Sequence, residues 1–345
     1  MVYKDDEINF SKTEVIKNKI NIRMPTTYNR IDENTKQTII FVTVFIVFLF
    51  IVAYIVDILL LKNHFNTFVI LIIFLFLSFG DYIFSNKLIL KENKAIPIER
   101  EKNKQLYNTT ENLCRIAGVP VPKIYKTPDM SINAFTVGKT PKKAYLVLTE
   151  GSLQRLNNLE LEGVIAHEIA HIQNNDVMLA TMLVFLLGFI RKIVDSAVKI
   201  VNSFVEIIRS GDIIESFIKA ALVSIFYVIV LMGMFLVLLL SCVPLIEELV
   251  FYKISRKREF LADAEGVLFT RYPKGLADAL EKISLDKSSL KIINSSTAHL
   301  YIASPYKDNL KNYWKRLFHS HPPIEKRIRI LKQMDDYGKI SYNSK

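Results

Sequence analysis

The stretch GVIAHEIAHIQNND, residues 163–176, places two histidines four positions apart, with a glutamate directly after the first. Residues i and i+4 share one face of a helix, so the imidazoles of His167 and His171 can converge on one metal ion. Glu168 then lies beside them, where its carboxylate can reach a water molecule at the metal. The intervening and flanking residues are mostly apolar, which predicts that this helix is buried.

A catalytic zinc site takes a third protein ligand and leaves one position open for water. The acidic candidates downstream are Glu247, Glu248, Glu259 and Glu265. We favour Glu259 in SRKREFLADAEG, because Asp263 follows it at i+4 on the same helix face. Asp263 can then hydrogen-bond a ligating imidazole from behind. The pattern predicts one zinc ion per chain, held by His167, His171 and Glu259.

Apolar runs predict an integral membrane protein. Half of the 345 residues are apolar, and uncharged runs of about 18 residues or more are typical of spanning helices. We predict about four such helices, at residues 38–61, 68–90, 177–190 and 220–243. The third run is short for a span, and the stripe that follows it also suits a helix lying at the membrane interface or packed on protein.

The net charge of +11 reflects lysines and arginines that crowd beside the apolar runs. This distribution is typical of cytoplasmic flanks, so we expect a multi-pass protein of the cell membrane with both termini and the catalytic domain in the cytoplasm. No base-reading motif accompanies the basic residues, so we expect the lipid bilayer and no nucleic acid as a partner. Cys114 and Cys242 form no Cys-x-x-Cys pair, which excludes a cysteine-based zinc site.

The polar segments predict a soluble domain of mixed α and β structure. KIYKT, NAFTVG and AYLVLT are short β-branched or aromatic runs bounded by Pro, Gly and Asp, and they predict a small sheet. A helix is expected over residues 99–119, ended by Pro120 and Pro122, and Asn158 is expected to cap the metal-motif helix. The chain divides into a polar leader (1–37), a transmembrane hairpin (38–90), a first protease segment (91–176), transmembrane or interfacial helices three and four (177–243), a second protease segment (244–331) and a tail (332–345).

Four motifs follow one another in the order NAFTVG, HEIAH, SRKREFLADAEG and SHPPIEKRIRIL. With this ordered set, over about residues 36–331, the chain resembles the HtpX-type membrane zinc metalloproteases, relatives of the type I CAAX prenyl proteases. The resemblance implies a mainly α membrane protein with a gluzincin-like α+β zinc protease domain. It also implies zinc ligation by His167, His171 and Glu259, and Glu168 as the general base.

The resemblance implies further roles. His321 and Arg327 match a family pair thought to face the reacting carbonyl oxygen, where a donor stabilises developing negative charge. Alternatively, HPP is a rigid turn and the arginine caps a helix or pairs with an aspartate. Asn133, Ala134 and Phe135 match an edge strand to which an extended substrate can add as a further strand. The alternative is that Asn133 only closes a turn.

The sequence therefore predicts a membrane-embedded zinc endopeptidase that acts on peptides and proteins. The resemblance implies a role in the quality control of membrane proteins, with misfolded membrane proteins as substrates. The first alternative is a CAAX-type prenyl-protein processing protease. The second is a non-catalytic zinc-binding membrane protein, against which Glu168 argues, since a structural zinc site does not need it. Residues 285–316 match no motif and could shape substrate access, and the oligomeric state stays open.

Overall fold

A computed structural model describes residues 27–57, 65–182, 184–185, 195, 198–199, 202–203, 258–286, 288, 300–303 and 322–343. The predicted fourth span, most of the stretch between it and the third, and His321 lie outside these residues. Across the residues that the structure describes, no helix combines the length and the apolar character needed to cross a membrane. The count of four spans remains a prediction.

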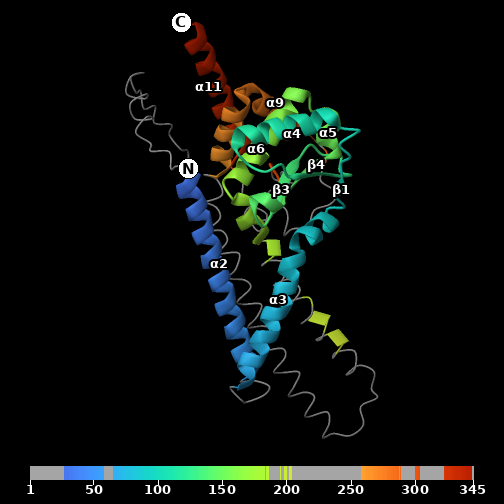
Figure 1. Ribbon diagram of the computed structural model, residues 1–345, viewed down its shortest axis with the longest axis vertical. Helices are drawn as coiled ribbons and strands as arrows, with labels where there is room; N and C mark the ends of the chain where they lie inside the picture. The colour runs from blue at the N-terminus through green and yellow to red at the C-terminus, as the bar shows by residue number, and fades with distance from the viewer. Residues whose placement is uncertain are drawn as a thin grey trace, which may run out of the picture.

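Two long helices, α2 (Thr27–Val56) and α3 (Phe65–Glu92), pack on each other and project from the part of the molecule that holds the sheet (Figure 1). They correspond to the predicted hairpin. Helix α2 begins inside the predicted polar leader, because residues 28–37 contain no glycine or proline to stop it. Both helices expose large apolar side chains, including Ile39, Ile40, Val47, Phe68, Ile72, Phe76, Phe79 and Ile83.

A four-stranded sheet has the order β1-β2-β4-β3. Its strands are β1 (Ile96–Pro97), β2 (Lys123–Thr127), β3 (Ala134–Gly138) and β4 (Ala144–Thr149). Strands β2 and β4 are parallel, and the other two pairs are antiparallel. The three predicted strands are confirmed, whereas β1, at two residues, is too short to produce a sequence pattern. Strand β3 is buried throughout, and its Phe135 forms an isolated antiparallel bridge with Tyr301.

Helices flank this sheet (Figure 1). Helix α6 (Asn158–Gln173) packs against β3, α4 (Lys104–Ala117) and α9 (Pro273–Leu285), and α9 also packs against α11 (Ile324–Asn343). Residues 258–270 form a further helical stretch, and α5 (Glu150–Arg155) is a short helix after β4. Their shared apolar core includes Leu113, Leu146, Leu148, Val164, Ile165, Ile169, Leu276, Leu280 and Leu331. Helix α6 therefore lies in the centre of the domain, as its apolar sequence predicts.

Two helix ends differ from the prediction. The cap of α6 is Asn157, not Asn158: its side chain accepts from the backbone of Glu160, whose carboxylate accepts in turn from the Asn157 backbone. This reciprocal pair satisfies two backbone donors, which a cap one residue later would leave open. Helix α4 ends at Ala117, before the prolines, because Gly118 adopts a left-handed conformation. Helix α11 runs from the second protease segment into the predicted tail, since no helix-breaking residue stands at residues 331–332; the division into segments remains a prediction.

Gly163 lets α6 and α9 approach closely, and Gly163→Ala is expected to destabilise the domain. A methyl group there would lie 2.6 Å from the backbone nitrogen of Leu276, which cannot rotate away. We expect the free energy of unfolding to fall by about 1–3 kcal/mol despite the better helix propensity of alanine. Thermal unfolding in detergent measures this. Gly80→Ala in α3 is the matched control, because no atom lies within 4 Å of the added methyl; equal destabilisation by both changes would refute the steric argument.

Candidate metal centre and active site

The three residues predicted as zinc ligands lie together at the centre of the domain. Suitable ligand atoms of His167, His171 and Glu259 all lie within 4.8 Å of one another. The two imidazole Nε2 atoms are 3.2 Å apart, and they lie 3.6 Å and 3.7 Å from the carboxylate oxygens of Glu259. A tetrahedral zinc ion with ligands at about 2.0–2.1 Å sets neighbouring ligand atoms about 3.3–3.5 Å apart. The observed separations fit that geometry.

The second nitrogen of each imidazole faces a carboxylate. Nδ1 of His167 lies 3.0 Å from Asp263, and Nδ1 of His171 lies 2.9 Å from Asp176. A carboxylate holds the proton on Nδ1, which leaves a lone pair on each Nε2. The two Nε2 atoms, 3.2 Å apart, can then both direct a lone pair at one cation. The donor set therefore fits a divalent metal such as zinc.

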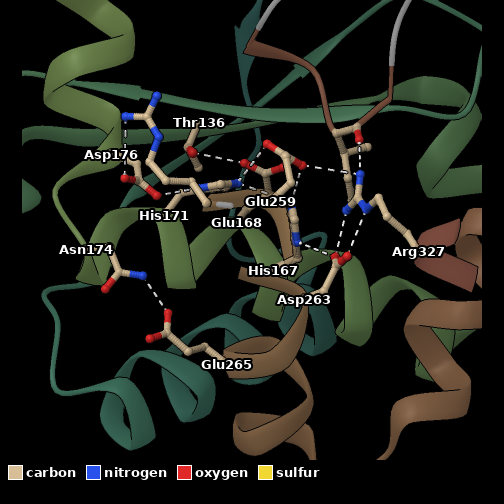
Figure 2. Close-up of polar contacts among 12 residues, drawn as sticks. Thr136, His167, Glu168, His171, Asn174, Asp176, Glu259, Asp263, Glu265 and Arg327 are labelled. Atoms are coloured by element: carbon tan, nitrogen blue, oxygen red, sulfur yellow. Dashed lines mark hydrogen bonds and ion pairs between the residues drawn. The ribbon is translucent and has the colours of Figure 1, made fainter. Parts of the chain in front are cut away.

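Of the other acidic candidates, Glu265 is the one that the structure describes, and it does not join this cluster. Glu265 binds the side-chain amide of Asn174, away from the histidines (Figure 2). Glu247 and Glu248 lie outside the described residues. Asp263 lies beside Nδ1 of His167, the position predicted for it.

Asp176 was missed by the sequence reasoning, although a local signal exists. Helix α6 ends at Gln173 with Asn174 as its C-cap, and Asn175 adopts a left-handed conformation with a φ of 59°. Asparagine tolerates this conformation better than most residues. The resulting turn brings the side chain of Asp176 back to His171, five residues earlier. Two asparagines followed by an aspartate, directly after the motif, are the feature that could have indicated it.

Glu168 lies beside the metal cluster and is 1% exposed. Its Oε2 accepts a hydrogen bond of 2.9 Å from the Thr136 hydroxyl of β3, which fixes the carboxylate relative to the histidines. Burial raises the pKa of Glu168 to about 7; nearby Glu259 reinforces the rise, whereas His171, the Thr136 hydrogen bond and Arg327 partly offset it. A base with a pKa near neutrality suits proton transfer to and from a reacting group.

Arg327 is fully buried and holds two of the carboxylates (Figure 2). Its Nε and Nη2 donate to both oxygens of Asp263, at 2.8 Å and 2.7 Å. Its Nη1 lies 3.3 Å from Glu259 and donates to the backbone carbonyl of Ile302 at 2.6 Å. Burial alone would raise the pKa of Asp263, but Arg327 and His167 together hold it below its usual value. Arg327 therefore pairs with an aspartate, which was the alternative role predicted for it from the sequence. Its contact with a reacting carbonyl oxygen stays a prediction.

The predicted substrate-binding residues lie at the edge of β3 and contact residues 300–303. Nδ2 of Asn133 donates to the carbonyl of Ala303 at 3.1 Å. The carbonyl of Ala134 accepts from the backbone of Ile302 at 2.9 Å, and the rings of Phe135 and Tyr301 pack edge to face at 4.8 Å. The contacts of Asn133 thus extend beyond a local turn. The contacts of Ile302 and Ala303 could not be predicted from the sequence, because they are made by backbone atoms.

Two imidazoles and a carboxylate converge on one point with a second carboxylate beside them, which is the arrangement that a metallopeptidase site requires. Residues 100–335 match the model of the family described as Peptidase family M48. The chain belongs to peptidase family M48. It is a metalloendopeptidase, as the resemblance predicted.

Curated relatives agree with this assignment over most of the chain. The chain is 39% identical to a "Protease HtpX homolog" of Dictyoglomus thermophilum, over 91% of this chain and 97% of that protein. It is 33% identical to a protein of the same description from Listeria welshimeri, over 89% of this chain and 99% of that one. The crystal structure of S. mikatae Ste24p is 20% identical with a TM-score of 0.46, covering 93% of this chain and 66% of that one. That structural likeness is too low to support an argument.

Proposed function

We propose that this metalloendopeptidase depends on one zinc ion per chain and hydrolyses peptide bonds of protein substrates at the cytoplasmic face of the membrane. The convergence of His167, His171 and Glu259 beside the buried carboxylate of Glu168 is the observation that carries the proposal. A purely structural metal site would not require a further, non-ligating carboxylate such as that of Glu168 beside its ligands.

Each residue of the centre has a task that follows from its contacts. When bound, the zinc ion supplies Lewis acidity and makes water a nucleophile near neutral pH. Asp263 and Asp176 keep the ligating histidines in the tautomer that offers Nε2. Glu168, oriented by Thr136, takes a proton from water and returns it to the nitrogen of the leaving amine.

The carbonyl oxygen of the scissile peptide gains negative charge as water attacks, and it needs a hydrogen-bond donor. We assign this task to Arg327 together with His321. Support for Arg327 comes from Nη1, which already donates to a peptide carbonyl, that of Ile302, next to Glu259. The part played by His321 rests on the sequence alone.

We also propose that α2 and α3 place the enzyme in the cell membrane. Their exposed large apolar side chains, such as Phe76 with 76% of its surface exposed, would cost free energy in water. The basic residues beside the apolar runs support the four-helix topology, with both termini and the catalytic domain in the cytoplasm. Substrates would then be peptide segments near the bilayer, such as those of misfolded membrane proteins.

Metal removal tests the proposal on the full chain in detergent. We expect one zinc per chain, cleavage of casein, loss of cleavage after treatment with a chelator, and recovery on adding zinc back. Membranes washed with alkaline carbonate should retain the protein. Cleavage that persists without metal would refute the zinc mechanism, and release by carbonate would refute the membrane placement.

A further inference from the structure

Segment 300–303 engages every described group that we assign to substrate binding. Ile302 donates its backbone N–H to Ala134 and its carbonyl accepts from Arg327. The carbonyl of Ala303 accepts from the side-chain amide of Asn133. A main-chain donor and two main-chain acceptors of one short segment are thus all satisfied at the active site. None of these three contacts depends on the side chains of the segment.

The segment also has the direction that an added strand would have. Strand β4 occupies one edge of β3, in the register that pairs Phe135 with Val147. Tyr301 lies opposite Phe135 on the other edge, in antiparallel orientation. An extended peptide that binds by strand addition pairs with such an edge through its backbone. Segment 300–303 therefore occupies the edge to which a substrate would add.

The position of this edge relative to the metal centre is fixed by two contacts. Thr136 of β3 donates to Glu168, so the strand borders the catalytic carboxylate. The Nη1 atom of Arg327 that binds the Ile302 carbonyl also lies 3.3 Å from Glu259. Figure 2 shows the Arg327 side chain beside Glu259 and Asp263. A peptide carbonyl of the chain itself is therefore linked through Arg327 to Glu259 of the metal-binding cluster.

Tyr301 anchors the segment at a point away from the metal ligands. Its ring packs edge to face on Phe135, and its hydroxyl donates to the side-chain oxygen of Asn93 at 2.8 Å. Only 1% of Tyr301 is exposed. This anchor can be weakened without changing any residue at the metal centre.

We propose that segment 300–303 is an internal substrate mimic, which must leave the edge of β3 before a peptide substrate can bind there. The proposal rests on the proposed function. It adds that the substrate is an extended peptide, antiparallel to β3, whose backbone replaces the contacts of Ile302 and Ala303 with Ala134, Arg327 and Asn133. If the segment is instead a permanent strand of the fold, holding it in place will not change the binding of a peptide substrate.

A reversible disulfide across the bridge tests this directly. Phe135 and Tyr301 oppose each other next to the Ile302–Ala134 hydrogen bond, as in a non-hydrogen-bonded antiparallel pair. Such pairs have Cα atoms about 4.5 Å apart, within the range that a disulfide spans. The variant is Phe135→Cys with Tyr301→Cys, with Cys242→Ser to remove one native thiol. The thiol of Cys114 can stay, because burial raises its pKa to about 12.

Two readouts are taken on the full chain in detergent, before and after reduction with a phosphine. The first is hydrolysis of a labelled casein peptide. The second is binding of that peptide, by fluorescence anisotropy, with Glu168→Gln added so that no cleavage occurs. We expect oxidation to weaken binding and to slow hydrolysis by about 10-fold or more, both reversed by reduction, since a locked segment excludes the peptide from the edge. The two single-cysteine variants should show no response to oxidation.

The outcomes separate the two proposals. Equal peptide binding in the oxidised and reduced states overturns the substrate mimic, whatever the activity. Absence of hydrolysis in the wild type overturns the proposed function, while the binding measurement still decides the role of the segment.

Tyr301→Phe is a milder second variant in case the double cysteine variant does not fold. It keeps the ring against Phe135 and removes only the hydrogen bond to Asn93. One neutral hydrogen bond is worth about a five-fold change in equilibrium, so we expect the KM for the peptide to fall by about five-fold with kcat unchanged. A KM that stays the same or rises, with lower thermal stability, would show that the segment is part of the permanent fold.

Discussion

Glu168→Gln is expected to lower the rate of casein hydrolysis by about 10²- to 10⁴-fold while the protein keeps its metal. Glutamine has the shape of glutamate but cannot accept the proton of the attacking water. The ligand atoms belong to His167, His171 and Glu259, so metal affinity should be nearly unchanged. Initial rates of casein cleavage and metal content by elemental analysis, both on protein purified in detergent, measure the two effects.

Variants at Thr136 provide a graded control for this result. Thr136→Ser keeps a hydroxyl that can donate to Glu168, whereas Thr136→Val keeps the volume and removes the donor. The rate of casein hydrolysis should fall by about 10-fold in the valine variant, because one hydrogen bond to a charged group is lost. The rate should fall much less in the serine variant. Wild-type rates for Glu168→Gln would mean that another group takes the proton.

Arg327→Met is expected to lower the free energy of unfolding by about 3–5 kcal/mol, because it leaves buried carboxylates without their cation. Arg327 makes a bidentate ion pair with Asp263, and its Nη1 lies 3.3 Å from Glu259. All three residues are buried. Thermal unfolding of metal-loaded and metal-free protein measures the loss. The loss should be greater without metal, because a bound cation offsets part of the charge of Glu259.

Two companion variants test the cause of that loss. Arg327→Lys keeps the positive charge but not the planar fork, so its effect should be smaller. Combining Arg327→Met with Asp263→Asn removes both partners, and the double variant should lose less stability than the two single losses added together. Strict additivity would indicate that the two side chains do not stabilise each other.

The parts of the site that lie close in sequence were predictable. The pairs His167 with His171 and Glu259 with Asp263 each follow from the i, i+4 spacing of one helix, and the structure brings all four side chains together. The role of Thr136 could not be predicted, because its contact with Glu168 depends on how β3 packs on α6. The carbonyl of Ile302 was out of reach for another reason: a backbone atom is the same in every residue type, so no pattern marks it.

The fold shows the same division between local and distant information. Strands β2, β3 and β4 were predicted because each has its own pattern and clear stop signals. The order that places β4 between β2 and β3 was not predicted, since it depends on pairing between separate segments. The cap of α6 was placed one residue late, because two neighbouring asparagines are equally good caps until the partner, Glu160, is considered.

The two halves of the metal centre are separated along the chain by the third and fourth apolar runs. During synthesis His167, Glu168 and His171 leave the ribosome first, whereas Glu259, Asp263 and Arg327 follow only after both runs have been made. A partly synthesised chain therefore holds two of the three ligands and lacks the arginine that compensates the charge of the carboxylates. The set of candidate metal-binding residues is therefore complete only after the last apolar run has been synthesised.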